Sequence, residues 1–157
     1  MTRTITGGDV RGTTQPLVGP VARGGFTGFN ADKVFLAATG INIERGLSTD
    51  NMLESEVKQA MLDAARQVIL VAHSKKFGQV YYHTFAHWNR VHTVITDAGL
   101  PKNTRRELEN LGVQGMITKT QYLILVLPGD LFGKTVLTYP TKLIVRITIA
   151  RYVSPLR

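Results

Sequence analysis

The polar side chains of greatest chemical interest follow a strongly apolar run. In VILVAHSKKFGQV, Val68–Val80, five apolar residues lead directly into a turn that contains His73, Ser74, Lys75 and Lys76. Open α/β sheets bind ligands just beyond the carboxyl ends of their strands, so a lysine placed there would face an anion. Ser74 and Lys76 could together hydrogen-bond and neutralise a phosphate. The alternative is a solvated turn whose two lysines extend into water, and the residues alone favour this alternative.

A second polar turn follows another apolar run. In RVHTVITDAGLP, Asp97 comes directly after a stretch with the composition of a buried strand. Its carboxylate could bind a ligand, or it could close an Asx-type turn by accepting hydrogen bonds from the backbone that follows. Here too the residues alone favour the structural role.

The sequence gives little support for a metal site, a cofactor site or a catalytic serine. His83 and His87 are four residues apart and could share a helix face, but HTFAH lacks the intervening glutamate of the zinc-protease pattern, and the chain has no cysteine. We therefore predict no metal site and expect partly exposed histidines on a short helix near Trp88. The sequence contains no glycine-rich phosphate motif of the Walker or dinucleotide type and no Gly-x-Ser-x-Gly elbow, so it predicts no cofactor and no catalytic serine.

A helix over Met52–Gln67 is the clearest element that could position these turns. Asn51 can cap it, and Glu54 follows at the spacing of a capping box. Apolar residues then recur at helical spacing, which predicts that one face packs into the core through Val57, Ala60, Met61 and Ala64.

Three apolar runs predict adjacent core strands at Val34–Ala38, Val68–Ala72 and Val91–Thr96. A second helix is expected to begin near Pro101, with a capping box from Thr104 to Glu107, and to end at Gly112. Strands that alternate with helices indicate an α/β fold with a mostly parallel sheet flanked by helices.

The two ends of the chain differ in composition from the alternating strands and helices between them. Glycine and proline interrupt the first thirty residues too often for a long helix, and short extended pieces are expected at Arg3–Thr6 and Pro16–Val18. The β-prone runs 122–132 and 142–153 predict two antiparallel strands joined at Pro128-Gly129-Asp130. We therefore divide the chain into a domain at 1–115 and a basic, β-prone tail at 116–157.

Composition restricts the class of protein. The chain has 157 residues, of which 43% are hydrophobic and 19% charged, as expected of a globular domain. It contains neither an apolar run long enough to span a bilayer nor a signal-peptide pattern, which favours a cytoplasmic protein. The net charge of +8 arises mostly in the last quarter, where single basic residues lack interleaved aromatics. This distribution disfavours a nucleic-acid footprint, because such footprints are basic stripes or patches.

A long ordered run resembles the sensor domain of DeoR-type bacterial transcriptional repressors. It includes TGGDVRGTTQPLVGPVA near the start, GLSTDN followed by EVKQAM, then SKKFG and ITDAGLP, and it extends from about Thr4 to Val113. The resemblance implies an incomplete version of the fold of ribose-5-phosphate isomerase, glucosamine-6-phosphate deaminase and CoA transferases. It also implies a sensor that binds a phosphorylated sugar or related metabolite as its effector.

The resemblance implies a particular set of effector-binding residues. The family's ligand lysine falls on Lys76, its Gly-Ala-Asp-Gly-type loop falls on Ala37–Gly40, and its Asn-x-x-Glu helix start falls on Asn51 and Glu54. With the neighbouring strand-end and Gly-Gly-x-x-Arg positions, the predicted effector site comprises Arg11, Thr39, Gly40, Asn51, Glu54, Ser74, Lys76 and Asp97.

The departures from the resemblance indicate a binder that is not an enzyme. Isomerases of this fold place acidic side chains near the positions of Thr39 and His73, and proton abstraction next to a carbonyl needs such a carboxylate. A sugar-phosphate isomerase-like enzyme and a basic nucleic-acid-binding module remain as alternatives. Repressors of this type also carry a winged helix-turn-helix, which this sequence does not show, so contact with DNA is expected only through such a domain in full-length relatives. Those relatives are also expected to form homo-oligomers.

Overall fold

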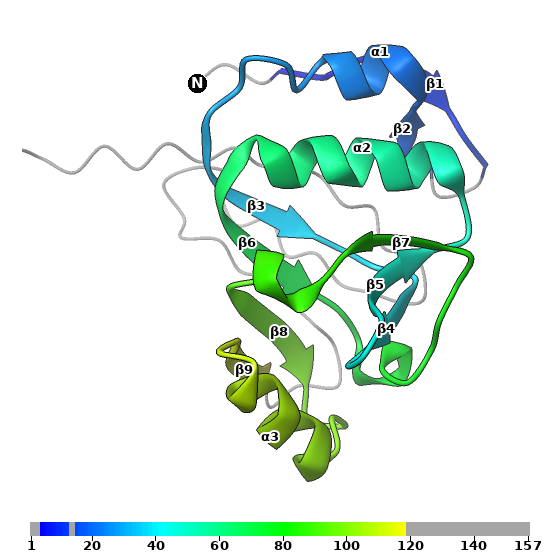
Figure 1. Ribbon diagram of the computed structural model, residues 1–157. Helices are drawn as coiled ribbons and strands as arrows, with labels where there is room; N and C mark the ends of the chain where they lie inside the picture. The colour runs from blue at the N-terminus through cyan, green and yellow to red at the C-terminus, as the bar shows by residue number, and fades with distance from the viewer. Residues whose placement is uncertain (1–3, 13–14, 119–157) are drawn as a thin grey trace, which may run out of the picture.

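The computed structural model describes residues 4–12 and 15–118 as an α/β fold (Figure 1). The main sheet contains β3 (Ala31–Leu36), β6 (Ala65–Val71), β8 (Thr93–Asp97) and β9 (Gln114–Thr118), hydrogen-bonded in that order and all parallel. The three predicted core strands are therefore neighbours in one sheet, as expected. Strand β3 begins and ends earlier in the chain than the predicted range Val34–Ala38. Ala37 and Ala38 therefore lie beyond its end.

Helix α2 (Met52–Asp63) packs against the sheet with its predicted apolar side. The Asn51 side chain caps the helix by accepting a hydrogen bond from the Glu54 N–H at 3.0 Å. Val57 and Met61 are buried in the core, and Ala60 and Ala64 pack against it. The helix ends four residues earlier than predicted, because Ala65 and Gln67 pair with Ala31 and Lys33 and so belong to β6.

A second, antiparallel sheet was not predicted. It is formed by β4 (Gly40–Asn42), β5 (Gly46–Thr49) and β7 (His83–Ala86). The expectation of a short helix around His83 and His87 is therefore wrong in part: His83 begins β7, and His87 precedes the 3-10 turn η2 (Trp88–Arg90). No group of three potential metal ligands occurs among the described residues.

Helix α3 (Lys102–Asn110) connects β8 to β9. Pro101 occupies the N-cap position without a side-chain hydrogen bond, so the predicted capping box at Thr104 is wrong and Thr104 lies inside the helix. Leu108 anchors α3 in the core. Gly112 follows the helix end with φ +77°, a conformation that favours glycine, and this agrees with its predicted role.

The glycine-rich start contains more structure than predicted. The short strands β1 (Asp9–Val10) and β2 (Leu17–Val18) pair antiparallel and lead into α1 (Gly19–Gly24), which packs on α2 through buried Ala22. Proline at the beginning of α1 supplies a favourable φ without losing a helical hydrogen bond, which explains a six-residue helix in so glycine-rich a segment. The described part of the predicted strand Arg3–Thr6 is not a strand.

Some expectations fall outside the described part of the chain. The predicted antiparallel strands at 122–132 and 142–153 lie there, so the proposed tail at 116–157 stays a prediction. Among the residues that the structure describes, no helix combines the length and apolarity required to cross a membrane.

Candidate anion-binding site

Lys76 lies where β3 and β6 end. It belongs to the 3-10 turn η1 (Ser74–Lys76) that follows β6, and its Nζ donates a hydrogen bond of 2.7 Å to the carbonyl oxygen of Ala38, just beyond β3. Burial lowers the pKa of Lys76 below its ordinary value of 10.5, and the nearby charge of Lys58 lowers it further. A half-buried ammonium therefore sits at the carboxyl edge of a parallel sheet, where this class of fold places ligands.

Hydroxyl groups of Thr39 and Thr49 lie beside the carboxylate at the beginning of α2. The Thr39 and Thr49 hydroxyl oxygens lie 3.3 Å apart, and the Thr49 hydroxyl also lies 3.3 Å from Glu54 Oε2. These contacts place the predicted residues Thr39, Asn51 and Glu54 together, since Asn51 caps the same helix.

Glu54 is shared among several donors. Arg11 Nη1 lies 3.5 Å from one carboxylate oxygen, and Lys58 Nζ lies 3.5 Å from the other. The predicted residue Arg11 is thus brought to the site from the strand β1 region, although its own side chain is about half exposed. Because each ion pair is long, Glu54 orients its partners without binding either one tightly.

Lys58 is a member of this cluster that sequence reasoning missed. Its ammonium lies between Glu54 and the ring of Phe85, 5.1 Å from the ring centroid. Burial lowers the pKa of Lys58, and attraction to Glu54 and Asp50 only partly offsets this effect. The helical pattern assigned Lys58 to the polar positions of α2. Its spacing of four residues from Glu54 was the one signal of an ion pair.

A series of contacts joins Lys58 to the neighbourhood of Lys76: Lys58 pairs with Glu54, Glu54 lies beside Thr49, and Thr49 lies beside Thr39, which follows the Ala38 carbonyl that Lys76 binds. The positive charge of Lys58 also lowers the pKa of Lys76. Two partly desolvated ammonium groups therefore share one region, and Arg11 adds a third cation at its rim. The carboxylates of Glu54 and Asp50 compensate only part of this charge. An arrangement of this kind favours a bound anion, because an anion would lower the electrostatic cost of holding both lysines charged.

Ser74 and Asp97 lie at the same edge but bind each other. Asp97 accepts hydrogen bonds of 2.7 Å from both the Ser74 hydroxyl and the Ser74 N–H, and one of 2.9 Å from the Gly99 N–H. Burial acts to raise the pKa of Asp97, but these hydrogen bonds and His73 outweigh it and the net shift is downward. In this structure both side chains hold η1 against the end of β8. The hydrogen bond from the Gly99 N–H closes the Asx-type turn that was the expected alternative at Asp97, whereas the turn at buried Ser74 is not the fully solvated one that the residues alone favoured.

His73 does not complete a catalytic triad with these two residues. Its Nδ1 lies 3.2 Å from Asp97 Oδ2 and also 3.2 Å from the Lys75 N–H. The Ser74 hydroxyl donates directly to the Asp97 carboxylate and not to a histidine nitrogen, so the serine–histidine contact of a triad is missing among these three residues. The arrangement holds a turn in place and does not activate a nucleophile.

Gly40 contributes close backbone packing. A Cβ on this residue would come within 2.7 Å of the Gln79 carbonyl oxygen and of the Tyr81 ring, so a larger residue would displace the loop that follows η1. Gly40 and Lys76 thus belong to one packed unit, which the backbone bond from the Gly78 N–H to the Ile41 carbonyl also ties together.

A separate shallow hollow of about 280 Å³ lies away from this cluster. It lies between the turn after α1 and the C-terminal half of α2, with Arg23, Phe29 and Asp63 among its lining residues. None of the described residues that line it belongs to the cluster around Lys76.

Comparisons with known proteins agree with the fold. Residues 1–98 match the family model described as the DeoR C terminal sensor domain. The chain is 37% identical over 109 residues to the HTH-type transcriptional regulator GlpR of Haloferax volcanii, which covers 69% of this chain and 43% of that protein. It is 31% identical over 110 residues to a putative aga operon transcriptional repressor of Escherichia coli O157:H7, covering 70% and 41%. The HTH-type transcriptional regulator IolR of Bacillus subtilis is 31% identical over 96 residues, covering 61% and 38%. The chain thus spans less than half the length of each of these relatives.

Proposed function

The chain belongs to the DeoR C-terminal sensor domain family, and from this premise we propose that it binds a phosphorylated sugar, or a related anionic metabolite, as an effector. The observation that carries the proposal is the Lys76 ammonium, held 2.7 Å from the Ala38 carbonyl oxygen at the carboxyl edge of the parallel sheet, next to the contacts that join Thr39 through Thr49 and Glu54 to Lys58. A phosphate dianion would meet both charges and the hydroxyl groups of Thr39 and Thr49.

Energetics favour an anion over a neutral sugar at this position. A hydrogen bond between charged partners contributes about 1.5–3 kcal/mol, roughly twice a neutral one. The Lys76 ammonium carries three donors, and its described hydrogen bond to Ala38 uses one of them. Binding a phosphate therefore need not cost the contact that holds the lysine at the edge of the sheet.

The alternative of an isomerase-like enzyme has less support. The named relatives are transcriptional regulators and repressors. The carboxylate oxygens of Asp97 already accept three hydrogen bonds, and Glu54 is flanked by Arg11 and Lys58, so neither is disposed as a free general base. We expect no turnover of pentose or hexose phosphates. Turnover abolished by changing His73 or Glu54 would restore the enzyme hypothesis.

The proposal assigns contact with DNA to a separate domain of a longer regulator. Helices α2 and α3 of the described part are separated by several strands and do not form a helix-turn-helix. We place this regulator in the cytoplasm, where its effector and its operator would meet, and we expect the sensor to act by altering the DNA affinity of a homo-oligomer. Salt-sensitive, sequence-independent DNA binding by this chain would instead favour the basic-module alternative.

Calorimetric titration with phosphorylated sugars and their unphosphorylated parents tests the proposal. Lys76→Ala should weaken binding of the phosphorylated ligand roughly tenfold to a hundredfold, since one charge-assisted hydrogen bond is lost. The matched control is Lys75→Ala, because Lys75 is the exposed neighbour in the same turn. Equal effects of the two substitutions, or equal affinity for a sugar and its phosphate, would contradict the proposal.

A further inference from the structure

The His83 imidazole differs from those of His73 and His92 in its bonding. His73 and His92 use Nδ1 to accept hydrogen bonds from the backbone N–H groups of Lys75 and Val68, so both hold the fold together. His83 is half-buried, and among the described residues no hydrogen bond or ion pair involves its imidazole. Polar groups removed from water normally have a partner, and an imidazole offers a donor and an acceptor. His83 therefore has free hydrogen-bonding capacity for a ligand.

The pairing of β5 with β7 places His83 beside the proposed effector site. His83 lies directly opposite Thr49 in this antiparallel pair. Opposite residues project from the same face of a sheet, with Cβ atoms about 4.5–5.5 Å apart. The Thr49 hydroxyl lies 3.3 Å from both the Thr39 hydroxyl and Glu54 Oε2. The register thus puts the imidazole on the face that carries these polar groups.

Burial along β7 gives the same placement independently. His83 is half-buried, Thr84 is exposed and Phe85 is buried, so His83 and Phe85 share the inner side of the strand. The Phe85 ring centroid lies 5.1 Å from Lys58 Nζ on α2, and α2 packs against β7. His83 accordingly faces the helix that supplies Glu54 and Lys58 to the site.

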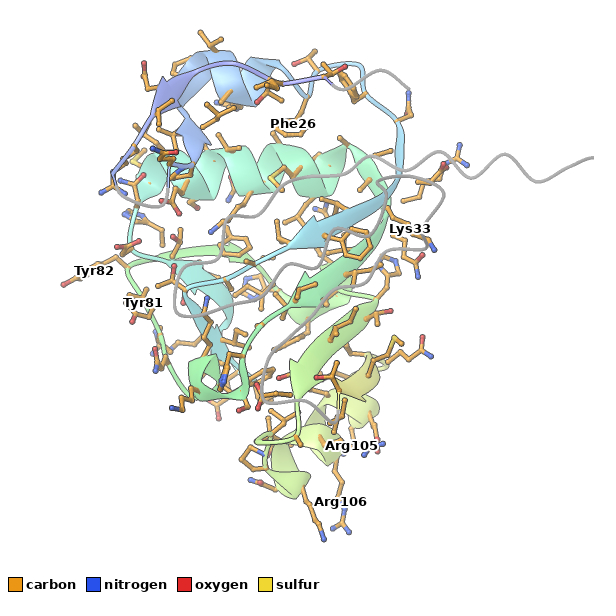
Figure 2. The ribbon with its side chains drawn as sticks, turned by 180° about the vertical axis from the view of Figure 1, so that it is seen from behind. Phe26, Lys33, Tyr81, Tyr82, Arg105 and Arg106 are labelled. Carbon is orange, nitrogen blue, oxygen red and sulfur yellow. The ribbon has the colours of Figure 1, made fainter. Side chains whose placement is uncertain are left out.

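His83 lies at the rim of this face, where solvent meets the buried groups. Tyr82, the residue before it, is 90% exposed, and Figure 2 shows the Tyr82 side chain extending away from the molecule. The Tyr81 N–H donates a hydrogen bond of 2.9 Å to the Ser48 hydroxyl, which fixes the chain where it enters β7. A ligand that enters from solvent can therefore meet the imidazole before it reaches the fully buried Thr49.

We propose that His83 hydrogen-bonds a hydroxyl or carbonyl oxygen of the sugar part of the effector and so helps to select among phosphorylated sugars. This inference rests on the proposed function, in which Lys76 binds the phosphate. The imidazole can donate to a sugar oxygen through one nitrogen and accept from a hydroxyl through the other. A site that binds a ligand hydroxyl discriminates against analogues that lack it, because its own polar group is then left unpaired.

Titrations with ribose 5-phosphate, fructose 6-phosphate and inorganic phosphate test the proposal. His83→Phe keeps an aromatic ring suited to a strand but removes both hydrogen-bonding atoms. It should weaken the tighter of the two sugar phosphates roughly threefold to tenfold, the effect of one neutral hydrogen bond, and leave inorganic phosphate unchanged. His83→Gln should recover part of the affinity, because its amide also donates and accepts. The matched control is His87→Phe, because His87 is the exposed histidine just after β7 and should change neither ligand.

Histidine ring NMR spectra of the unmodified protein provide a measurement that does not depend on how a variant folds. The sugar phosphate should shift the ring resonances of His83, which are identified by their loss in His83→Gln. The resonances of His92 should stay in place, because His92 binds Val68 at the amino end of β8, away from the site.

The outcomes separate this inference from the proposed function. Sugar-phosphate affinity that falls with Lys76→Ala but not with His83→Phe would overturn the role of His83 and leave the proposed function standing. Equal losses for sugar phosphate and inorganic phosphate, or unshifted His83 resonances, would also overturn that role. If none of the three probes binds the unmodified protein, the inference and the proposed function both fail.

Discussion

At the scale of single residues, the proposed role of Lys58 and Lys76 predicts that effector binding is coupled to proton binding. Their folded-state pKa values lie below 10.5, so in the range between the lowered pKa and 10.5 the unfolded chain binds more protons than the folded chain. The contribution of these lysines to stability therefore rises as the pH rises through that range. A bound anion favours the charged lysines and raises both pKa values.

We accordingly predict proton uptake when the anion binds at alkaline pH below 10.5. The measurement is calorimetric titration in buffers of different ionisation enthalpy, in which the apparent binding enthalpy should change with the buffer. The double variant Lys58→Met/Lys76→Met should lose the buffer dependence along with most of the affinity. An apparent enthalpy that is independent of the buffer in the unmodified protein would contradict the prediction.

A further prediction concerns the contribution of Asp97 to stability at acidic pH. Its folded pKa is depressed, so its stabilising contribution is fully present above its unfolded pKa of about 3.9 and is lost as the pH falls through the folded value. Asp97→Asn should lower the free energy of unfolding at neutral pH by about 1.5–3 kcal/mol, the contribution of a hydrogen bond to a charged group.

The difference between Asp97→Asn and the unmodified protein should therefore shrink as the pH falls below about 4. Denaturant unfolding across that range provides the measurement. Glu107→Gln serves as the control, because Glu107 is exposed on α3 and should show no such trend. A constant difference at every pH would show that the carboxylate charge of Asp97 does not contribute.

At the scale of elements, the start of α2 serves both the fold and the site. The Asn51 side chain accepts a hydrogen bond from the Glu54 N–H. The same turn places the Glu54 carboxylate beside Arg11 and Lys58. Asn51→Ala should destabilise the protein by about 1 kcal/mol, the usual cost of losing an N-cap. It should also weaken effector binding, because fraying of this turn would release Glu54.

Thermal unfolding and titration of Asn51→Ala test these two effects together. Asn103→Ala is the matched control, because Asn103 is an exposed asparagine at the start of α3 with no described capping role. A loss of stability without any loss of affinity would show that the α2 cap supports the fold alone.

At the scale of the whole molecule, the sequence predicted the main sheet better than it predicted the site. Continuous apolar runs and the Asn51 cap identified β3, β6, β8 and α2, because both signals are local. The second sheet gave no such signal: its strands are three or four residues long, and β5 buries Ser48 and Thr49 in place of alternating apolar residues.

The site depended on contacts between segments far apart in the chain. Residues Ser74 and Asp97 looked like independent ligand candidates until the fold paired them. Lys58 escaped notice because a long side chain can carry its ammonium away from the polar side of its helix. Only the folded arrangement shows that this ammonium lies between Glu54 and the ring of Phe85.

The crowding of positive charge at the carboxyl edge of the sheet also bears on how long the protein survives in the cell. A ligand present at a hundredfold excess over its dissociation constant stabilises the folded state by about 2.7 kcal/mol. Proteases that cleave transiently opened molecules respond to that population, so effector-bound copies should persist while empty copies are degraded. Limited proteolysis with and without the phosphorylated ligand should show slower cleavage when it is bound, and Lys76→Ala should abolish the protection. The abundance of the metabolite would then set the abundance of its own sensor.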